Sequence, residues 1–551
     1  MKFSKLTLAI AATLTASASF NALAMDLYVD TKTKQIYAEP GRGRVLLGAF
    51  EKVGSGTPTT TVAAPAAAPA ELAAIKQDLA LKTNEIKALE EHAAEATKPD
   101  AVKIKLDDGI EMATRDGNFT AAIHGRIQVD SQTNINQNLG SNYLNPNTSS
   151  TAQTGVPTSL NDAAGVRRAR LGLEGTFFKI TDYKFEYDFT RGPAASAGGI
   201  TDAFVRLNIS KPLSVKVGAF KEPFSLEEAT SNRYLTFIER NMAVNTFIDN
   251  LNTYKVGIGG NYAVERWQVG TSMQTEGVGP YNNAYGTGAT QSATNGQGGV
   301  NRNGGGGDTS WELNARVTGL PWMESNTKFW HVGASGSYID INNNYTGTGA
   351  YNNGGVIFAN GIGNNMDRTA ILNTGNLTYN TGTTKLGQAN HLARWGAETA
   401  VVYGPFSAQS EYIETDVYGT GYNGNSLRGA YGYATYFLTG ESRNYRSKTA
   451  SWDRIKPNHN FDLKGGWGAW EVAAGYDYMN LGAGAIHGGK ASTAKVGLNW
   501  YPNSHVRLMA NYIHALDIST YQGTAPNADL TSRAFNNASL DMLETRVQLD
   551  W

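Results

Sequence analysis

From residue 119 to the C-terminus, apolar and polar residues alternate with a period of two in one short segment after another. The clearest segment is YKFEYDF at residues 183–189, where aromatic residues alternate with Lys184, Glu186 and Asp188. Successive side chains of a β-strand point to opposite faces, so each segment predicts a strand with one apolar and one polar face. A soluble sandwich with a solvated face has the same alternation. A membrane barrel with lipid outside and water inside has it too.

The number of segments favours the barrel. We count roughly sixteen, an even number as expected for a closed outer-membrane barrel. They begin near residues 118, 165, 182, 200, 214, 253, 265, 309, 329, 391, 406, 429, 468, 491, 505 and 542. The connections alternate between short turns and long polar loops, and the last strand ends on an outward-facing Trp551. We therefore predict an all-β fold, an antiparallel transmembrane β-barrel of roughly sixteen strands over residues 105–551.

Two connections in this predicted barrel stand out. Residues 222–252, after the fifth strand, are long and charged and are expected to fold inward and narrow a pore, because long structured loops tend to be functional. Residues 441–467 form a long connection after the twelfth strand, where the alternation of loop lengths predicts a short turn.

Four shorter regions precede the barrel. Residues 1–24 have Lys2 and Lys5, an apolar run and a small-residue end at Ala22–Ala24, the pattern of a cleaved secretory signal peptide. Residues 25–53 predict a short β element, and residues 54–70 an Ala/Pro/Thr linker. Residues 71–97 place apolar side chains on a heptad frame, which predicts a periplasmic coiled coil and self-association, or a lone amphipathic helix: Leu72, Ile75, Leu79, Ile86 and Leu89.

Composition limits the function. The 47 basic and 48 acidic residues nearly cancel, which argues against nucleic-acid binding. The chain has no cysteine, which excludes disulfides and thiolate chemistry. The histidines show no metal-ligand spacing, and no nucleophile motif supports a barrel hydrolase. We expect no enzyme activity, metal or cofactor.

Five stretches resemble the phosphate-selective porin O and P family: Arg167–Phe189, Val217–Asn241, Tyr436–Arg446, Gly465–Leu481 and Leu498–His514. The resemblance implies a homotrimeric, sixteen-stranded channel of the Gram-negative outer membrane with an anion-preferring constriction. It also implies that an external loop and a periplasmic turn both fold into the lumen.

An anion-selective pore needs positive side chains facing the water. Because side chains alternate in direction along each predicted strand, many basic side chains are expected to point into the lumen. Each of them either contacts anions or pairs with a carboxylate of the barrel wall. The resemblance implies a pore site made of Arg126, Arg167, Arg168, Asp202, Ser231, Arg233 and Arg240, and the alternation along the predicted strand adds Arg170.

The resemblance is broken at Glu228, where phosphate-binding members carry a lysine. Glu227 and Glu228 would lower the positive potential of the loop, which leaves a general anion channel or a weak cation preference open. The sequence thus predicts a porin for passive diffusion of small anions such as phosphate. The alternatives are a general, weakly selective porin and a structural barrel that tethers the envelope.

Overall fold

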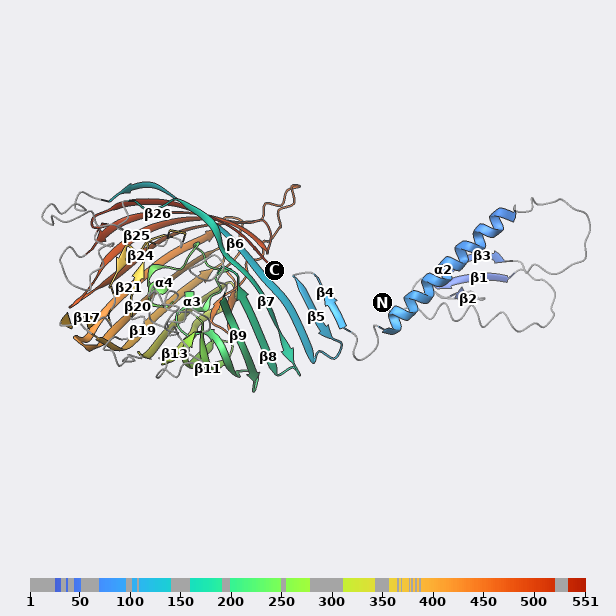
Figure 1. Ribbon diagram of the computed structural model, residues 1–551. Coiled ribbons are helices and arrows are strands. Elements are labelled where there is room, and N and C mark those ends of the chain that lie inside the picture. The colour runs from blue at the N-terminus through green and yellow to red at the C-terminus, as the bar shows by residue number, and fades with distance from the viewer. Residues whose placement is uncertain are drawn as a thin grey trace, which may run out of the picture. The chain divides into compact units, whose positions relative to one another are not determined.

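The computed structural model describes part of the chain with defined secondary structure (Figure 1). The described residues are 25–30, 36–37, 44–50, 69–95, 102–106, 109–139, 159–190, 199–248, 254–277, 311–341, 356–363, 366–367, 369–375, 377, 380–381, 384–385, 388–520 and 534–551. The chain divides into two compact units, residues 1–92 and 93–551.

The first unit contains a small antiparallel sheet with the order β2-β1-β3, built from β1 (Met25–Asp30), β2 (Ile36–Tyr37) and β3 (Arg44–Phe50). Helix α2 spans Pro69–Glu95. The predicted signal peptide and most of the predicted linker lie outside the described residues. None of the described helices has the length and apolarity needed to cross a membrane as a helix.

The second unit is a closed barrel, and its described residues form sixteen long antiparallel strands, as the alternation predicts (Figure 1). They are β6 (Phe119–Asn138), β7 (Ala163–Phe177), β8 (Thr181–Asp188), β9 (Gly199–Asn208), β10 (Leu213–Lys221), β11 (Tyr254–Ala263), β12 (Trp267–Gly277), β13 (Trp311–Ser325), β14 (Lys328–Asp340), β19 (Gln388–Tyr403), β20 (Phe406–Thr420), β21 (Tyr422–Phe437), β24 (Ala469–Ala483), β25 (Ile486–Tyr501), β26 (Val506–Ser519) and β27 (Ser539–Asp550).

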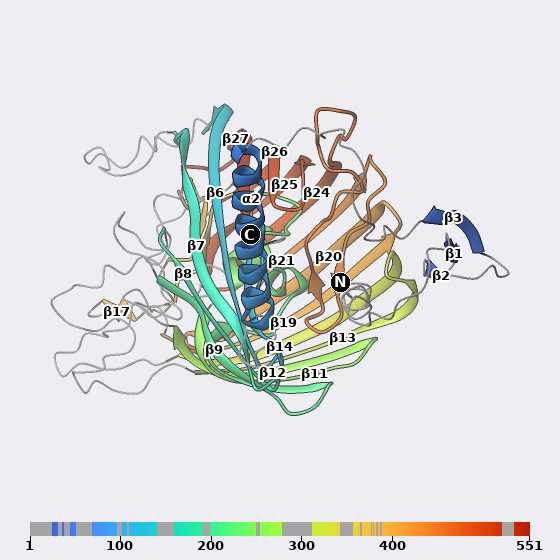
Figure 2. The same cartoon turned by 90° about the vertical axis from the view of Figure 1, so that its right-hand side faces the viewer.

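Strand β27 closes the barrel by pairing with the second half of β6, and Figure 2 shows the two side by side. The first half of β6 pairs instead with a hairpin that the alternation did not reveal, β4 (Val102–Lys105) and β5 (Ile110–Thr114). At the junction, Trp551 exchanges two main-chain hydrogen bonds of 3.1 Å with Gly125.

The predicted faces are confirmed over most of the wall. In β6, Arg126, Gln128 and Asp130 are buried toward the lumen, whereas Ile127 and Val129 are exposed. A β-bulge in β7 interrupts the alternation, because Gln128 pairs with Arg168 and Val129 with Val166. The extra residue is Arg167. A bulge re-aims a side chain, so two consecutive arginines reach the lumen.

The expected polar lining fails in one region. In β20, Ile413 and Val417 are fully buried, whereas Glu414 and Asp416 on the other face are only half-buried. An apolar cluster occupies this part of the lumen. It joins helix α4 (Met242–Phe247) to the short strands β15 (Ala359–Asn360) and β16 (Leu372–Asn373) of the connection after β14. Two-residue strands β17 (Asn380–Thr381) and β18 (Thr384–Lys385) pair in the same connection.

Two segments enter the lumen, as expected. The inserted loop, residues 222–248, follows β10 and carries helices α3 (Leu226–Ala229) and α4. The inserted turn, residues 441–455, follows β21 and carries strands β22 (Tyr445–Arg446) and β23 (Ser451–Trp452). They meet where the Trp452 main-chain N–H donates to Thr230 Oγ1 at 3.2 Å. Figure 1 shows α3 and α4 among the barrel strands.

Candidate functional site

The inserted loop begins with a buried carboxylate. Glu222 accepts from Arg394 Nη2 at 2.5 Å and from Lys255 Nζ at 2.6 Å. Burial raises the pKa of Glu222, but Arg394 and then Lys255 outweigh it and lower the pKa to about 2. Glu222 is therefore ionised at neutral pH and ties the loop to two strands of the wall.

The wall also holds the first turn of α3. Glu411 on β20 accepts from the main-chain N–H groups of Leu226 at 3.1 Å and Glu227 at 2.8 Å. Ser225 caps the same turn by accepting from the Glu228 N–H. First-turn N–H groups have no partner within the helix, so these contacts satisfy donors that would otherwise be buried without acceptors.

Three predicted arginines converge on Glu186 of β8. Glu186 lies 2.6 Å from Arg126 Nη2, 2.9 Å from Arg170 Nη1 and 3.7 Å from Arg233 Nη2. Asp188 accepts from Arg170 Nε at 2.7 Å. The cluster thus has three guanidinium groups and two carboxylates, a surplus of one positive charge.

Glu239 of the inserted loop organises a second cluster. It accepts from Arg167 Nε, Arg168 Nη1 and Arg546 Nη2 at 3.0, 3.0 and 2.8 Å. Arg546 also bonds to Asp130 at 2.6 Å. Burial raises the pKa of Glu239, but the three guanidinium groups, Arg167 first, hold it well below the ordinary range. This cluster also has three arginines and two carboxylates.

Of the remaining predicted residues, only Ser231 lies next to one of the two arginine clusters. Asp202 lies 3.3 Å from Lys184. The Ser231 hydroxyl accepts from the Arg233 main-chain N–H at 3.4 Å, next to the Glu186 cluster. Arg240 pairs with Glu228 at 2.9 Å and donates to the Thr230 carbonyl. The structure therefore gathers most of the predicted arginines but separates Arg240 from them.

The two loop glutamates are shielded from the lumen. Glu228 pairs with Lys221 at 2.9 Å as well as with Arg240. Both Glu227 oxygens accept from Asn241, at 3.0 and 2.7 Å. Burial, and then the nearby Glu411, raise the pKa of Glu227 to about 8. Neither residue presents an open negative charge at neutral pH.

Two lumen cations rest on aromatic rings. Lys216 Nζ lies 4.1 Å from the Phe220 ring centroid, and the Arg443 guanidinium carbon lies 3.9 Å from that of Trp452. Arginine stays charged, and a ring attracts a cation without supplying a counter-charge, so Arg443 adds to the positive potential of the lumen.

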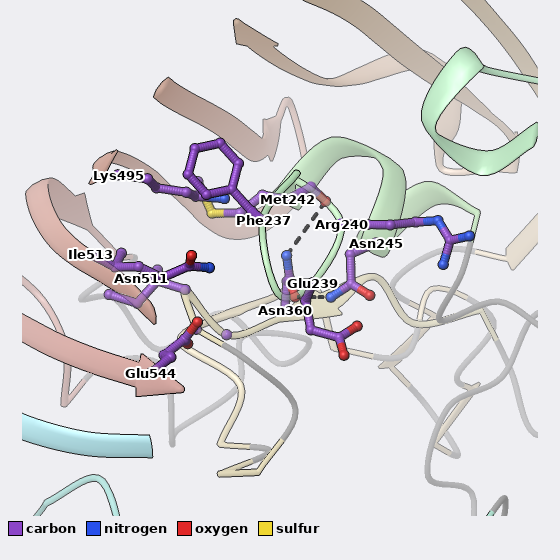
Figure 3. Close-up of a pocket in the computed structure, with 13 residues that line it drawn as sticks. Phe237, Glu239, Arg240, Met242, Asn245, Asn360, Lys495, Asn511, Ile513 and Glu544 are labelled. Carbon is purple, nitrogen blue, oxygen red and sulfur yellow. Dashed lines mark hydrogen bonds between the residues drawn. The ribbon is translucent and has the colours of Figure 1, made fainter. Parts of the chain in front are cut away.

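Figure 3 shows a small pocket where the inserted loop meets residues 360–363 and strands β25–β27. Arg240 and Lys495 lie in its lining together with Glu239 and Glu544. Asn245 donates to Asn360 Oδ1 at 2.8 Å, and Asn360 donates to the Met242 carbonyl at 3.4 Å. These bonds join the inserted loop to the connection after β14.

Some important residues lay outside the predicted site. Arg394 has the same parity on β19 as Glu398, so parity alone could have placed it in the lumen. Glu239 and Glu222 carried no such signal, because loop residues have no alternation to show their direction. Glu186 was expected only as one of several wall carboxylates.

Comparisons with known proteins show which chains this one resembles. The sequence model of the family described as "Phosphate-selective porin O and P" matches residues 143–551. Porin O of Pseudomonas aeruginosa is 28% identical over 435 residues, covering 75% of this chain and 87% of that protein. An uncharacterized protein of Caulobacter vibrioides is 26% identical over 499 residues, covering 90% and 85%. Among solved structures, OmpT of Vibrio cholerae aligns with a TM-score of 0.43 and 11% identity, covering 79% and 98%.

The closed barrel and its polar, charged lumen define an outer-membrane porin, a channel and not a soluble domain. The chain belongs to the phosphate-selective porin O and P family.

Proposed function

We propose that this porin passes small anions, phosphate among them, by passive diffusion, and that it has no enzyme activity. The surplus of positive charge in the Glu186 and Glu239 clusters carries the proposal. Arginine suits such a site because its planar fork matches phosphate oxygens and stays charged. In the proposed path, Arg126, Arg167, Arg168, Arg170 and Arg233 attract the anion, and Ser231 and Asp202 border it.

Pairing of each arginine with a carboxylate supports weak binding and fast transit. Conduction requires a site that is favourable enough to enter and weak enough to leave. An arginine that already has a carboxylate partner attracts a passing anion without trapping it. The shielding of Glu227 and Glu228 favours this proposal over weak cation preference.

The proposed assembly is a homotrimer in outer-membrane lipid. Residues 1–24 would be removed as a signal peptide, and residues 54–70 would link the 25–53 element to a coiled coil at residues 71–97. In the single chain, Leu79, Ile86 and Leu89 of α2 are exposed, which supports a partner helix. We propose no nucleic-acid partner.

The test is the reversal potential of the purified trimer in a planar bilayer under a potassium chloride gradient. The proposal expects anion selectivity, and added phosphate should reduce the chloride current. A potential near zero would favour the general porin, and a cation-selective potential would overturn the proposal. A barrel without measurable conductance would favour an envelope tether.

A further inference from the structure

Arg394 of β19 contacts both ends of the inserted loop. Its Nη2 donates to Glu222 Oε1 at 2.5 Å, and its Nη1 donates to the Phe247 carbonyl at 2.6 Å. Its guanidinium carbon lies 4.4 Å from the ring centroid of Phe224. One wall side chain therefore holds the first residue of the loop and the last residue of α4.

Each nitrogen of the Arg394 guanidinium donates to a protein atom. Its Nε donates to Ser337 Oγ at 3.0 Å, so all three nitrogens have partners, and the residue is buried. A planar fork reaches partners in different directions at once, whereas a lysine has a single head group. The contacts of Arg394 therefore need a guanidinium group, because the single ammonium group of lysine cannot reach partners in all these directions.

The same arrangement recurs on other strands. Three more buried wall arginines pair with a carboxylate and donate to main-chain carbonyls of the inserted segments: Arg546 to Ile238 at 2.5 Å, Arg507 to Leu235 at 2.5 Å and Thr236 at 3.2 Å, and Arg316 to Ala450 at 2.9 Å and Thr449 at 3.4 Å. Their carboxylates are Glu239 and Asp130, Glu471, and Glu398.

A carbonyl contact of this kind has a specific consequence. An arginine whose donors point at main-chain oxygens of a loop fixes the path of that loop. The loop carbonyls need these donors, because a buried carbonyl without a partner is costly. The inserted loop has few regular hydrogen bonds of its own, since its two helices span only four and six residues.

We propose that Arg394, with Arg316, Arg507 and Arg546, acts as a positioning residue of the constriction. These arginines hold the inserted loop and the inserted turn in the lumen, and they do not contact the permeating ion. The inference rests on the proposed channel function, but not on its preference for anions.

The absence of cysteine from the chain permits a clean test. Thr246 in α4 is fully buried beside Phe247, so Thr246→Cys introduces a single thiol that reagents reach only when the loop leaves its place. The rate of labelling by a small, water-soluble methanethiosulfonate is measured in full-length trimers with and without Arg394→Lys. Single-channel conductance is measured for Arg394→Lys alone.

Arg394→Lys should raise the labelling rate at least about tenfold, equal to about 1.4 kcal/mol, and should increase the conductance. The control is Arg206→Lys, because Arg206 pairs with the wall residue Asp182 at 2.6 Å. This control should leave both quantities within about twofold of the parent. Barrel folding is checked by the mobility shift on heating in detergent. If Thr246→Cys does not fold, the single-channel conductance of Arg394→Lys is the test of the proposal.

Unchanged labelling and conductance in Arg394→Lys would overturn the proposal. Lower conductance with unchanged labelling would also overturn it, because that result assigns Arg394 to the ion path. The reversal potential of the parent trimer is recorded in the same membranes. A cation-selective parent would remove the proposed anion function and leave the test of Arg394 intact.

Discussion

The main-chain N–H of Trp452 donates to the Thr230 hydroxyl at 3.2 Å. Thr230 belongs to the loop after β10, and Trp452 belongs to the turn after β21, so this bond joins segments that enter the barrel from opposite ends. The same hydroxyl donates to the Leu226 carbonyl at 2.8 Å. The constriction is therefore a single unit built from two segments of the chain, the inserted loop and the inserted turn.

Thr230→Val tests this junction. Valine keeps the volume of the side chain but leaves the buried Trp452 N–H without an acceptor, which costs about 1–3 kcal/mol. We expect the inserted turn to separate from the inserted loop, with higher single-channel conductance and more frequent switching between levels. Bilayer recording measures both. Thr435→Val is the control, because Thr435 bonds to the wall residue Glu471 at 2.6 Å, and equal effects of the two variants would contradict the junction.

Glu186→Gln should strengthen anion preference. The substitution leaves Arg126 and Arg170 without their shared carboxylate. Two unit charges about 4 Å apart interact by about 1 kcal/mol in water and by more in a partly screened lumen. We expect the anion-to-cation permeability ratio to rise roughly threefold to tenfold, together with stronger block of chloride current by phosphate.

Glu174→Gln provides the comparison for Glu186. Glu174 is a half-exposed lumen carboxylate near Lys184 and His124, with Nζ and Nε2 distances of 3.8 and 3.7 Å. If selectivity followed only the number of exposed negative charges, Glu174→Gln would have the larger effect. That outcome would remove the arginine cluster from the selectivity mechanism.

The pH dependence of loop docking follows from Glu227. Burial and the neighbouring Glu411 raise the pKa of Glu227 from 4.5 to about 8, while Arg240 and the Asn241 N–H oppose the shift. Between these values the docked loop binds more protons than the undocked loop, so docking weakens as the pH rises from 4.5 toward 8. Labelling of Thr246→Cys should accelerate over this interval after correction for thiolate formation. Glu227→Gln should reduce the dependence.

Glu222 predicts the opposite trend at low pH. Its pKa is lowered to about 2 in the docked loop, so its contribution is complete above about 4.5 and is lost as the pH falls toward 2. The two residues together predict the firmest docking at mildly acidic pH. Docking that strengthened as the pH rose from 5 to 8 would contradict the Glu227 assignment. Docking that strengthened as the pH fell from 4.5 toward 2 would contradict the Glu222 assignment.

Gly125→Ala should weaken closure of the barrel. A Cβ on Gly125 would lie 2.3 Å from the Trp551 ring, so the terminal tryptophan has to move. Overpacking of this kind costs about 1–3 kcal/mol. The expected result is a lower temperature for the mobility shift of the folded barrel in detergent. Gly336→Ala is the control, since its Cβ would meet only the Arg394 carbonyl oxygen, at 3.9 Å.

The alternation of apolar and polar residues determined most of the wall without any other information. Each strand buries one face against lumen contents and turns the other toward lipid, so a period of two identifies both the strand and its faces. The alternation stopped identifying the faces of a strand where protein fills the lumen, as at Ile413 and Val417. An apolar residue there packs in the apolar cluster around α4 and not against lipid.

The sequence by itself determined the strands, the lumen-facing arginines, the long loop after the fifth strand, the single out-of-rhythm connection at residues 441–467 and the family. Only the tertiary structure decided which basic side chain pairs with which carboxylate. Arg394 finds Glu222 across 172 positions, and Arg546 finds Asp130 across 416. Strand parity gives the direction of a side chain but not its partner, since the partner depends on barrel closure and on the path of the inserted loop. The same local pattern fits an arginine that meets ions and one that holds a loop.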